Sequence, residues 1–251
     1  RDRYWGEEDK LIKLSSDDFN LRSKEKNTIE WVVPDTFANP IGQIGISINS
    51  EDNVSGKVLI NYLNISGTPK MTFRRPDHID EYKRGIFYKE EVYGQLWKRA
   101  WVNDVDKWQY RHNESFKVVR GIGRGHIMTG SETWKDYSIS SKISIPLASA
   151  AGLIVRSQGL KRYYSLELTS ENKLKINKME YELKTLNEID FNLEYFKDYD
   201  LKFKVDGNKL QGYVDNQLLI EAEDSSNPFE EGMMGFLTEN GAIQSNSISI
   251  E

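Results

Sequence analysis

The stretch Tyr199-Asp-Leu-Lys-Phe-Lys-Val-Asp-Gly-Asn-Lys-Leu-Gln-Gly-Tyr-Val-Asp-Asn-Gln-Leu218 decides the fold class. Its first half alternates Leu201, Phe203 and Val205 with charged residues, and its second half alternates in the same way. Alternation places successive side chains on opposite faces of a strand. The Asp-Gly-Asn sequence between the two halves tolerates the positive φ of a tight turn. The stretch therefore predicts a β-hairpin with one buried and one solvent-facing side.

The same period of two recurs along most of the chain, and no helix longer than a turn or two is predicted. Alternating runs occur near residues 44–48, 58–62, 137–145 and 201–214. Half-polar alternation is typical of antiparallel sheets, whereas parallel sheets have continuous apolar runs. Short strands separated by such turns predict an all-β fold, an antiparallel sandwich or jelly roll.

The chain divides unevenly. Four strands are predicted before residue 66, at Lys10–Leu14, Thr28–Val33, Ile41–Ile48 and Lys57–Ile65. Four strands are too few to close a two-sheet sandwich, so this unit is interpreted as a partial jelly roll whose beginning is missing. Residues 69–95 are irregular and charge-rich, which indicates a linker, and strands follow one another from residue 96 to 251. The predicted domains are residues 1–68, 69–95 and 96–251.

Three segments carry a family resemblance. The segment from Gly152 to Leu168 and the hairpin at 199–218 resemble the central strands of concanavalin A-like (laminin-G-like) sandwiches. The segment from Ile29 to Leu63 is similar to the last strands of a galactose-binding-like jelly roll. Their order resembles the C-terminal region of bacterial ADP-ribosylglycohydrolase-like proteins, in which the hydrolase domain comes first. That family's metal-binding aspartates sit in Gly-Asp motifs, and this chain has no Gly-Asp dipeptide. The resemblance implies an upstream catalytic domain in the same polypeptide and no catalytic residue here.

Composition excludes several classes of function. The 251 residues include 34 basic and 39 acidic side chains, giving a formal charge of -5. This balance argues against nucleic acid as a partner, because nucleic-acid binding needs a basic face. The absence of cysteine excludes disulfides and thiolate metal sites. No apolar run approaches the roughly 20 residues that span a bilayer, so a soluble chain without a membrane partner is expected. The compartment stays open.

One carboxylate motif suggests an enzyme as an alternative. The Glu-x-Asp-x-x-x-Glu motif of laminarinase-type glycosidases is matched by Glu188, Asp190 and Glu194. Retaining glycosidases use two carboxyl groups about 5–5.5 Å apart as nucleophile and acid/base. Against this interpretation, the residues after Asn192 have the character of a polar loop, which would place Glu194 outside a cleft.

Metal and nucleophile signals are weak. His78, His112 and His126 lie far apart in the sequence and are expected to make local hydrogen bonds. The sequence contains no Asp-x-Asp-x-Asp cluster of the kind that forms a calcium loop. Calcium therefore stays open as a cofactor, and no residue is predicted as its ligand. The glycine-rich run Gly121–Gly125 is not followed by a helix and is interpreted as part of a strand with close backbone packing.

Two sets of side chains are candidates for binding carbohydrate. If Leu153 and Val155 point into the core, alternation places a polar set outward. That set is Arg156, Gln158, Tyr163, Glu167, Gln211 and Tyr213, which we expect on one sheet face. Trp108 and Tyr110 are predicted to be exposed rings for sugar stacking, whereas Trp97 and Trp101 are expected to fill the gap between the two units. A solvated face with an Arg156–Glu167 cross-strand pair is the alternative for the polar set.

The sequence thus favours a non-catalytic accessory region that binds carbohydrate or docks a neighbouring hydrolase domain. The alternatives are a laminarinase-like glycoside hydrolase using Glu188 and Glu194, and a purely structural interaction module.

Overall fold

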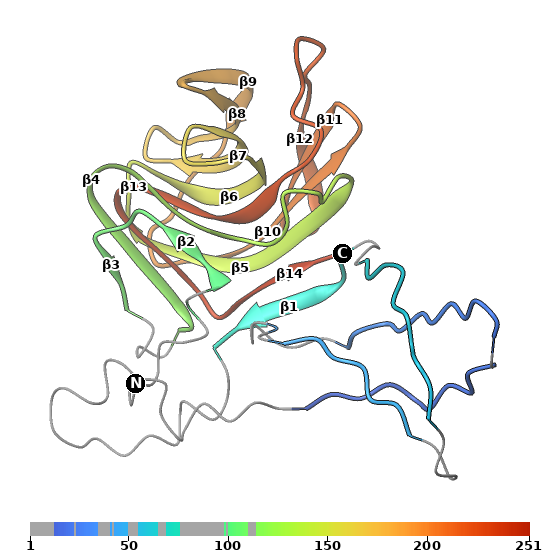
Figure 1. The fold of residues 1–251 in the computed structure, drawn as a ribbon. Helices are drawn as coiled ribbons and strands as arrows, with labels where there is room; N and C mark the ends of the chain where they lie inside the picture. The colour runs from blue at the N-terminus through green and yellow to red at the C-terminus, as the bar shows by residue number, and fades with distance from the viewer. Residues whose placement is uncertain are drawn as a thin grey trace, which may run out of the picture.

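The computed structural model describes residues 13–22, 24–34, 41, 43–49, 55–64, 69–75, 98, 100–109 and 114–251. These residues form fourteen β-strands, all of whose pairings are antiparallel, and the predicted all-β class is confirmed (Figure 1). Within them no helix is long and apolar enough to cross a bilayer.

The strands make two curved layers that face each other. The first layer runs β12 (Gln217–Glu223), β11 (Lys209–Val214), β10 (Asp198–Asp206), β5 (Tyr137–Leu147), β14 (Ser247–Ile250) and β1 (Met71–Arg74). The second runs β9 (Glu182–Asp190), β8 (Lys173–Glu180), β7 (Arg162–Thr169), β6 (Ala150–Ser157), β13 (Met233–Ser245) and β4 (Phe116–Thr129). Two short strands, β2 (Val102–Asn103) and β3 (Lys107–Trp108), pair with the outer edge of β4.

Strand β13 joins the two layers. Its first half, from Met233 to Glu239, lies between β4 and β6 in the second layer. Its second half, from Gly241 to Ser245, remains paired with β4 and also pairs with β5 of the first layer. Asn240, between the halves, has a positive φ of 49°, and the register with β4 shifts there. The bend lets one strand contribute to both sheets.

The core between the layers confirms the alternation. Leu153 and Val155 of β6 are fully buried in it, and they meet Phe203 of β10 and its alternating neighbours in the same cluster. The hairpin β10–β11 also forms as predicted, with Asp206 paired to Lys209. Gly207 in its turn has φ 56°, a conformation that glycine adopts without steric cost.

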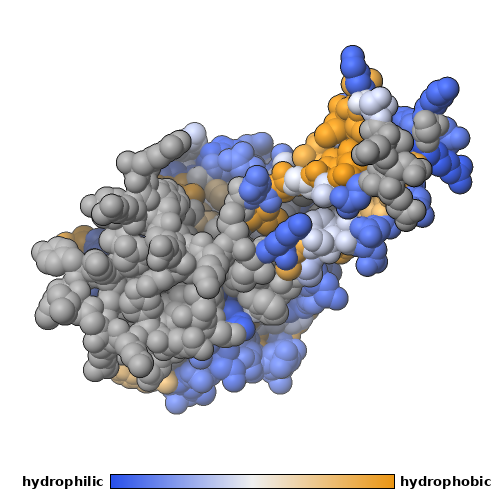
Figure 2. All heavy atoms as spheres, turned by 60° about the horizontal axis from the view of Figure 1, so that its bottom comes forward, coloured by the Kyte–Doolittle hydropathy of each residue, from blue (hydrophilic) through white to orange (hydrophobic). Residues whose placement is uncertain are grey.

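The four strands predicted before residue 66 are not observed in the described part of that range. Those residues carry no strand, and Figure 1 shows them as extended segments that project from the sandwich. Alternation makes a segment suited to a sheet, but a strand forms only where a neighbour completes its ladder of hydrogen bonds. Apolar side chains gather on the projecting part in Figure 2. The exposed ones include Trp31, Val32, Ile44, Ile46, Ile48, Val58, Leu59, Ile60 and Tyr62.

One strand of the sandwich comes from the predicted linker. Strand β1 pairs with β14, and Thr72 Oγ1 lies 2.9 Å from Ser249 Oγ. Phe73 is buried against Trp101, with ring centroids 5.7 Å apart. The sandwich therefore includes residues 71–74, which lie outside the predicted range of 96–251.

Candidate functional site

A set of polar side chains lies on the second layer, on the face that points away from the core. We call this set the polar strip. It consists of Asp104 before β4, Arg124 and His126 on β4, Tyr163, Ser165 and Glu167 on β7, Asn177 on β8, and Glu239 on β13. Ile154, Leu237 and Met128 form a small apolar cluster with Tyr163 on the same face. The strip and this cluster together make up a face separate from the sandwich core.

Arg124 is the centre of the polar strip. Its Nη1 and Nη2 donate to the two carboxylate oxygens of Glu167 at 2.8 and 2.9 Å, a bidentate pair. Its Nε lies 2.9 Å from Glu239 Oε2. The Glu167 side chain is buried, whereas Arg124 and Glu239 remain 16% and 28% exposed. The guanidinium is thus held rigidly between two carboxylates and still reaches the surface.

Small residues on β6 allow this contact. Arg124 and Glu167 are separated by β13 and β6, so the arginine side chain must cross both strands. At this level the side of β6 that carries the strip has only Ala150 and Gly152, since Ala151 and Leu153 point into the core. A Cβ on Gly152 would also collide with the carbonyl oxygen of Leu166 on β7. A glycine at 152 therefore permits both the close strand pairing and the path of Arg124.

Electrostatics keep the Arg124–Glu167 pair charged. Burial opposes the charge on both partners, but their mutual hydrogen bonds and attraction outweigh it. The pKa of Arg124 is raised and the pKa of Glu167 is lowered as a result. Ser165 Oγ donates to Glu167 Oε1 and contributes to this lowering. The carboxylate of Glu167 therefore stays ionised under the strip.

His126 and Tyr163 extend the polar strip beside Arg124. His126 Nε2 lies 2.9 Å from the Tyr163 hydroxyl, and Asp104 Oδ1 accepts from the His126 backbone N–H at 2.8 Å. The imidazole Nδ1 is buried and makes no hydrogen bond, although Asp104 Oδ1 is 3.3 Å away. Burial lowers the pKa of His126 despite the nearby Asp104 carboxylate, and burial raises the pKa of Tyr163 to about 12. Both side chains are therefore neutral at pH 7.

This lowered pKa predicts an acid-sensitive fold. In the unfolded chain His126 takes up a proton as pH falls below about 6.5, while the folded protein resists that protonation. The free energy of unfolding should therefore decrease as pH drops through that value. The His126→Gln variant, which keeps a nitrogen near the Tyr163 hydroxyl, should have a flatter profile. Urea unfolding between pH 7.5 and 5 measures both slopes, and equal slopes for the two proteins would contradict the prediction.

Alternation placed two of the predicted site residues on the correct face. Tyr163 and Glu167 lie on the side of β7 away from the core, although both are buried. The predicted Arg156–Glu167 pair does not form, because Glu167 binds Arg124 instead. Arg124 and Glu239 were not identified as candidates from the sequence, because they lie on strands that are far from β7 along the chain. The glycine-rich run around Arg124 is indeed part of a strand, β4, as predicted.

Arg156 was predicted to face solvent, and this was wrong. The register between β6 and β13 shifts beside it, and its φ is 47°, which turns its side chain inward. Its guanidinium donates to the carbonyl oxygens of Lys135, Gly207 and Phe229, and it pairs with Asp136 at 2.7 Å. Arg156 thus ties together loops at one end of the sandwich.

The other predicted binding residues do not share one face. Gln211 and Tyr213 are on β11 in the first layer, because the β10–β11 hairpin pairs with β5. Gln158 is exposed after the end of β6, where its amide donates to the Glu231 carbonyl oxygen at 3.2 Å. Alternation shows on which face of its strand a side chain lies, but it does not show to which of the two layers the strand belongs. This explains the error.

The predicted exposed tryptophan is buried. Trp108 lies in the core beside Trp101 and stacks on Phe116 with ring centroids 5.6 Å apart. Its partner in that prediction, Tyr110, lies outside the described residues, as do Trp97, His78 and His112. Trp101 is also a core residue.

The carboxylates of the glycosidase motif bind lysines. Glu188 lies within 3.8 Å of Lys173 Nζ, and the same nitrogen lies 2.8 Å from Asp190 Oδ1. The hydrogen bond from Lys173 lowers the pKa of Asp190, whereas a general acid requires a raised pKa. Glu194 is on the loop after β9, as predicted, and pairs with Lys197 at 2.6 Å. These contacts give no support to the hydrolase alternative.

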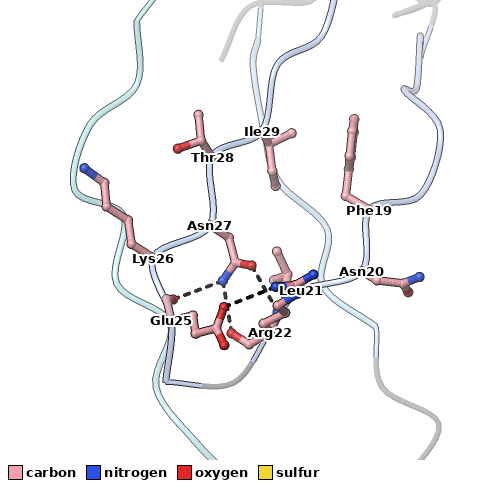
Figure 3. Close-up of a pocket in the computed structure, with 9 residues that line it drawn as sticks. All are labelled: Phe19, Asn20, Leu21, Arg22, Glu25, Lys26, Asn27, Thr28 and Ile29. Atoms are coloured by element: carbon pink, nitrogen blue, oxygen red, sulfur yellow. Dashed lines mark hydrogen bonds and ion pairs between the residues drawn. The ribbon is translucent and has the colours of Figure 1, made fainter.

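A pocket of about 280 Å³ lies outside the sandwich (Figure 3). It is lined by residues 19–22 and 25–29, where Asn27 closes a loop through hydrogen bonds with the Arg22 backbone. Every lining residue is exposed, so the pocket lacks the buried walls of a ligand site. Among the described residues, no group of three or more His, Asp or Glu side chains is arranged to hold a metal ion.

Comparisons with known proteins relate the sandwich to solved folds. No protein-family model and no curated protein matches the chain. The carbohydrate-binding module CBM66 from Bacillus subtilis is 22% identical, with a TM-score of 0.55 over 61% of this chain and 95% of that one. A protein with a galectin-like fold from Bacillus subtilis is 10% identical, with a TM-score of 0.49 over 62% and 90% of the two chains. The chain shares its β-sandwich fold with the first of these.

Proposed function

We propose that the sandwich is a non-catalytic module that binds carbohydrate on the face that carries the polar strip. The observation that carries the proposal is Arg124, which is fixed by Glu167 and Glu239 and yet exposed at its edge. Sugar hydroxyls both donate and accept hydrogen bonds, so they fit a surface where an arginine and a carboxylate are exposed side by side. The fold shared with a carbohydrate-binding module supports the proposal.

Preorganisation favours binding by this surface. Ordering a long side chain on binding costs about 0.5–1.5 kcal/mol. Arg124 is already held at three nitrogens before any ligand arrives, so most of this cost does not arise. Recognition at the strip is polar: Trp108 is buried, and the Tyr163 ring is covered, so neither offers a stacking surface.

Glu239→Ala tests the proposal. Removing a partly exposed acceptor should weaken carbohydrate binding at least about tenfold, the effect of losing one charge-assisted hydrogen bond. Binding is found on a glycan array and then measured by isothermal calorimetry. The control, Gln211→Ala, removes an amide from the other layer and should leave affinity unchanged. Loss of affinity in the control alone would place the site on the first layer and overturn the proposal, as would a lack of glycan binding by the wild-type chain.

Three further predictions belong with this function. A relation to ADP-ribosylglycohydrolase-like proteins and the docking of a hydrolase domain remain predictions from the sequence. The exposed apolar side chains of residues 29–63 are compatible with docking, since large apolar patches mark interaction surfaces. The division into a partial unit, a linker and a sandwich likewise remains a prediction.

A further inference from the structure

Resting on the proposed function, we infer that the polar strip selects uncharged sugars with neighbouring hydroxyls and rejects acidic sugars such as uronates. The inference concerns the class of ligand, and it depends on how the charges of this face are already paired.

The arginine of the strip is neutralised before a ligand binds. Proteins that bind carboxylates or sulfates use an arginine whose fork is available for a bidentate contact. In Arg124 that fork is taken by Glu167, with both Nη atoms donating to the two carboxylate oxygens. Glu239 approaches the remaining edge at Nε. A ligand carboxylate would have to displace Glu167 and leave it buried without its partner, which is unfavourable.

The neighbouring cations are paired as well. The register sets Lys175 on β8 and Glu188 on β9 in line with Glu167, so all three side chains share the face of the strip. Lys175 Nζ lies 3.0 Å from Glu171 and 3.6 Å from Glu188. Lys173 is similarly bound to Asp190 at 2.8 Å. These two lysines beside the strip therefore have carboxylate partners already.

Among the described charged residues of the polar strip and the β8–β9 edge beside it, carboxylates outnumber cations. The cations named above are Arg124, Lys173 and Lys175, and the carboxylates are Asp104, Glu167, Glu171, Glu188, Asp190 and Glu239. His126 adds no positive charge at pH 7, since burial keeps it neutral. Like charges near a binding surface raise the energy of the wrong ligand, which is how specificity against it arises.

The groups left for a ligand suit hydroxyls. A guanidinium has five N–H groups, and contacts with Glu167, Glu239 and the Tyr163 hydroxyl take four of them, so one N–H of the partly exposed Arg124 side chain remains for a ligand. Glu239 and Asp104 are 28% and 31% exposed and offer carboxylate oxygens. Of two neighbouring sugar hydroxyls, one can accept a hydrogen bond from the Arg124 guanidinium and the other can donate one to the carboxylate of Glu239 or Asp104.

The test compares matched sugars that differ only in charge. Gluco-, galacto- and manno-oligosaccharides are each measured beside the corresponding oligouronate and its uncharged methyl ester, by calorimetry at about 20 mM ionic strength. We expect a neutral oligosaccharide to bind at least about tenfold more tightly than its uronate, with the methyl ester recovering most of the affinity. The difference should shrink in about 0.5 M NaCl, because salt screens exposed charges.

Isosteric variants assign the effect to the strip. Asp104→Asn and Glu239→Gln each remove one negative charge. Both should therefore reduce the ratio of the affinity for the neutral sugar to the affinity for the uronate. Glu221→Gln, on β12 in the other layer, should leave the ratio unchanged. Uronates binding as tightly as neutral sugars would overturn the inference and leave the proposed function intact. Methyl esters that bind as poorly as uronates would overturn it too, since exclusion would then be steric. If no member of the panel and no array glycan binds, the proposed function fails and the inference with it.

Discussion

Replacing Arg124 by methionine should lower the free energy of unfolding by about 3–5 kcal/mol, because Glu167 would lose its partner while buried. Methionine keeps much of the volume of the side chain but none of its donors. The side chains of Ser165 and Asn177 would still hydrogen-bond Glu167, but two neutral groups do not balance a buried carboxylate. Urea unfolding at pH 7, analysed at constant slope, measures the loss.

A second variant separates charge from packing. In the Arg124→Met/Glu167→Gln double variant the buried group is an uncharged amide, so much of the lost stability should return. A double variant as unstable as the single one would show that the methionine disturbs the packing around β6 rather than leaving a charge unpaired. The wild-type pair should also weaken in acid, because the lowered pKa of Glu167 makes its contribution present above pH about 4.5 and lost as pH falls through the folded-state value.

Replacing Arg156 by methionine should have a comparable effect for a different reason. Three carbonyl oxygens, those of Lys135, Gly207 and Phe229, would lose their donor. An unsatisfied carbonyl costs about 1–3 kcal/mol when it is buried. The Phe229 contact is buried and the other two are partly buried, so a total loss of about 2–4 kcal/mol is expected. Asp136 is 58% exposed and contributes little to this sum, since water solvates it once the pair is broken.

The matched control for Arg156 is Arg162→Met. Arg162 is a third exposed and pairs with Glu180 at 3.2 Å, so its loss should cost less than about 1 kcal/mol. Similar losses in the two variants would contradict the structural role assigned to Arg156. Unfolding is measured in urea for both proteins under the same conditions.

Local chemistry made the sandwich predictable, and long-range pairing limited the prediction of the site. The hairpin at 199–218 was recognisable because its alternation and its Gly207 turn act within a few residues. Alternation also placed Tyr163 and Glu167 on the correct face. It could not show that Arg124 would reach Glu167 across two intervening strands, since that contact depends on the order of strands in the sheet.

Two errors have equally physical causes. The turned side chain of Arg156 results from a shift in register, and a single irregular residue leaves no mark on the alternation of the sequence. The segments before residue 66 have the pattern of strands but no strand is formed in their described part. The alternation of side chains shows which face each one would take in a sheet. Whether a sheet forms depends on a neighbouring strand that supplies the hydrogen bonds.

The position of β13 has a consequence for biosynthesis. Strands β4, β5 and β6 all pair with β13, which is synthesised only after more than 80 further residues have followed β5. Until then the apolar faces of those strands lack their central neighbour, so the sandwich cannot close during most of its translation. Nascent chains of this protein should therefore need protection from aggregation until residue 245 has emerged.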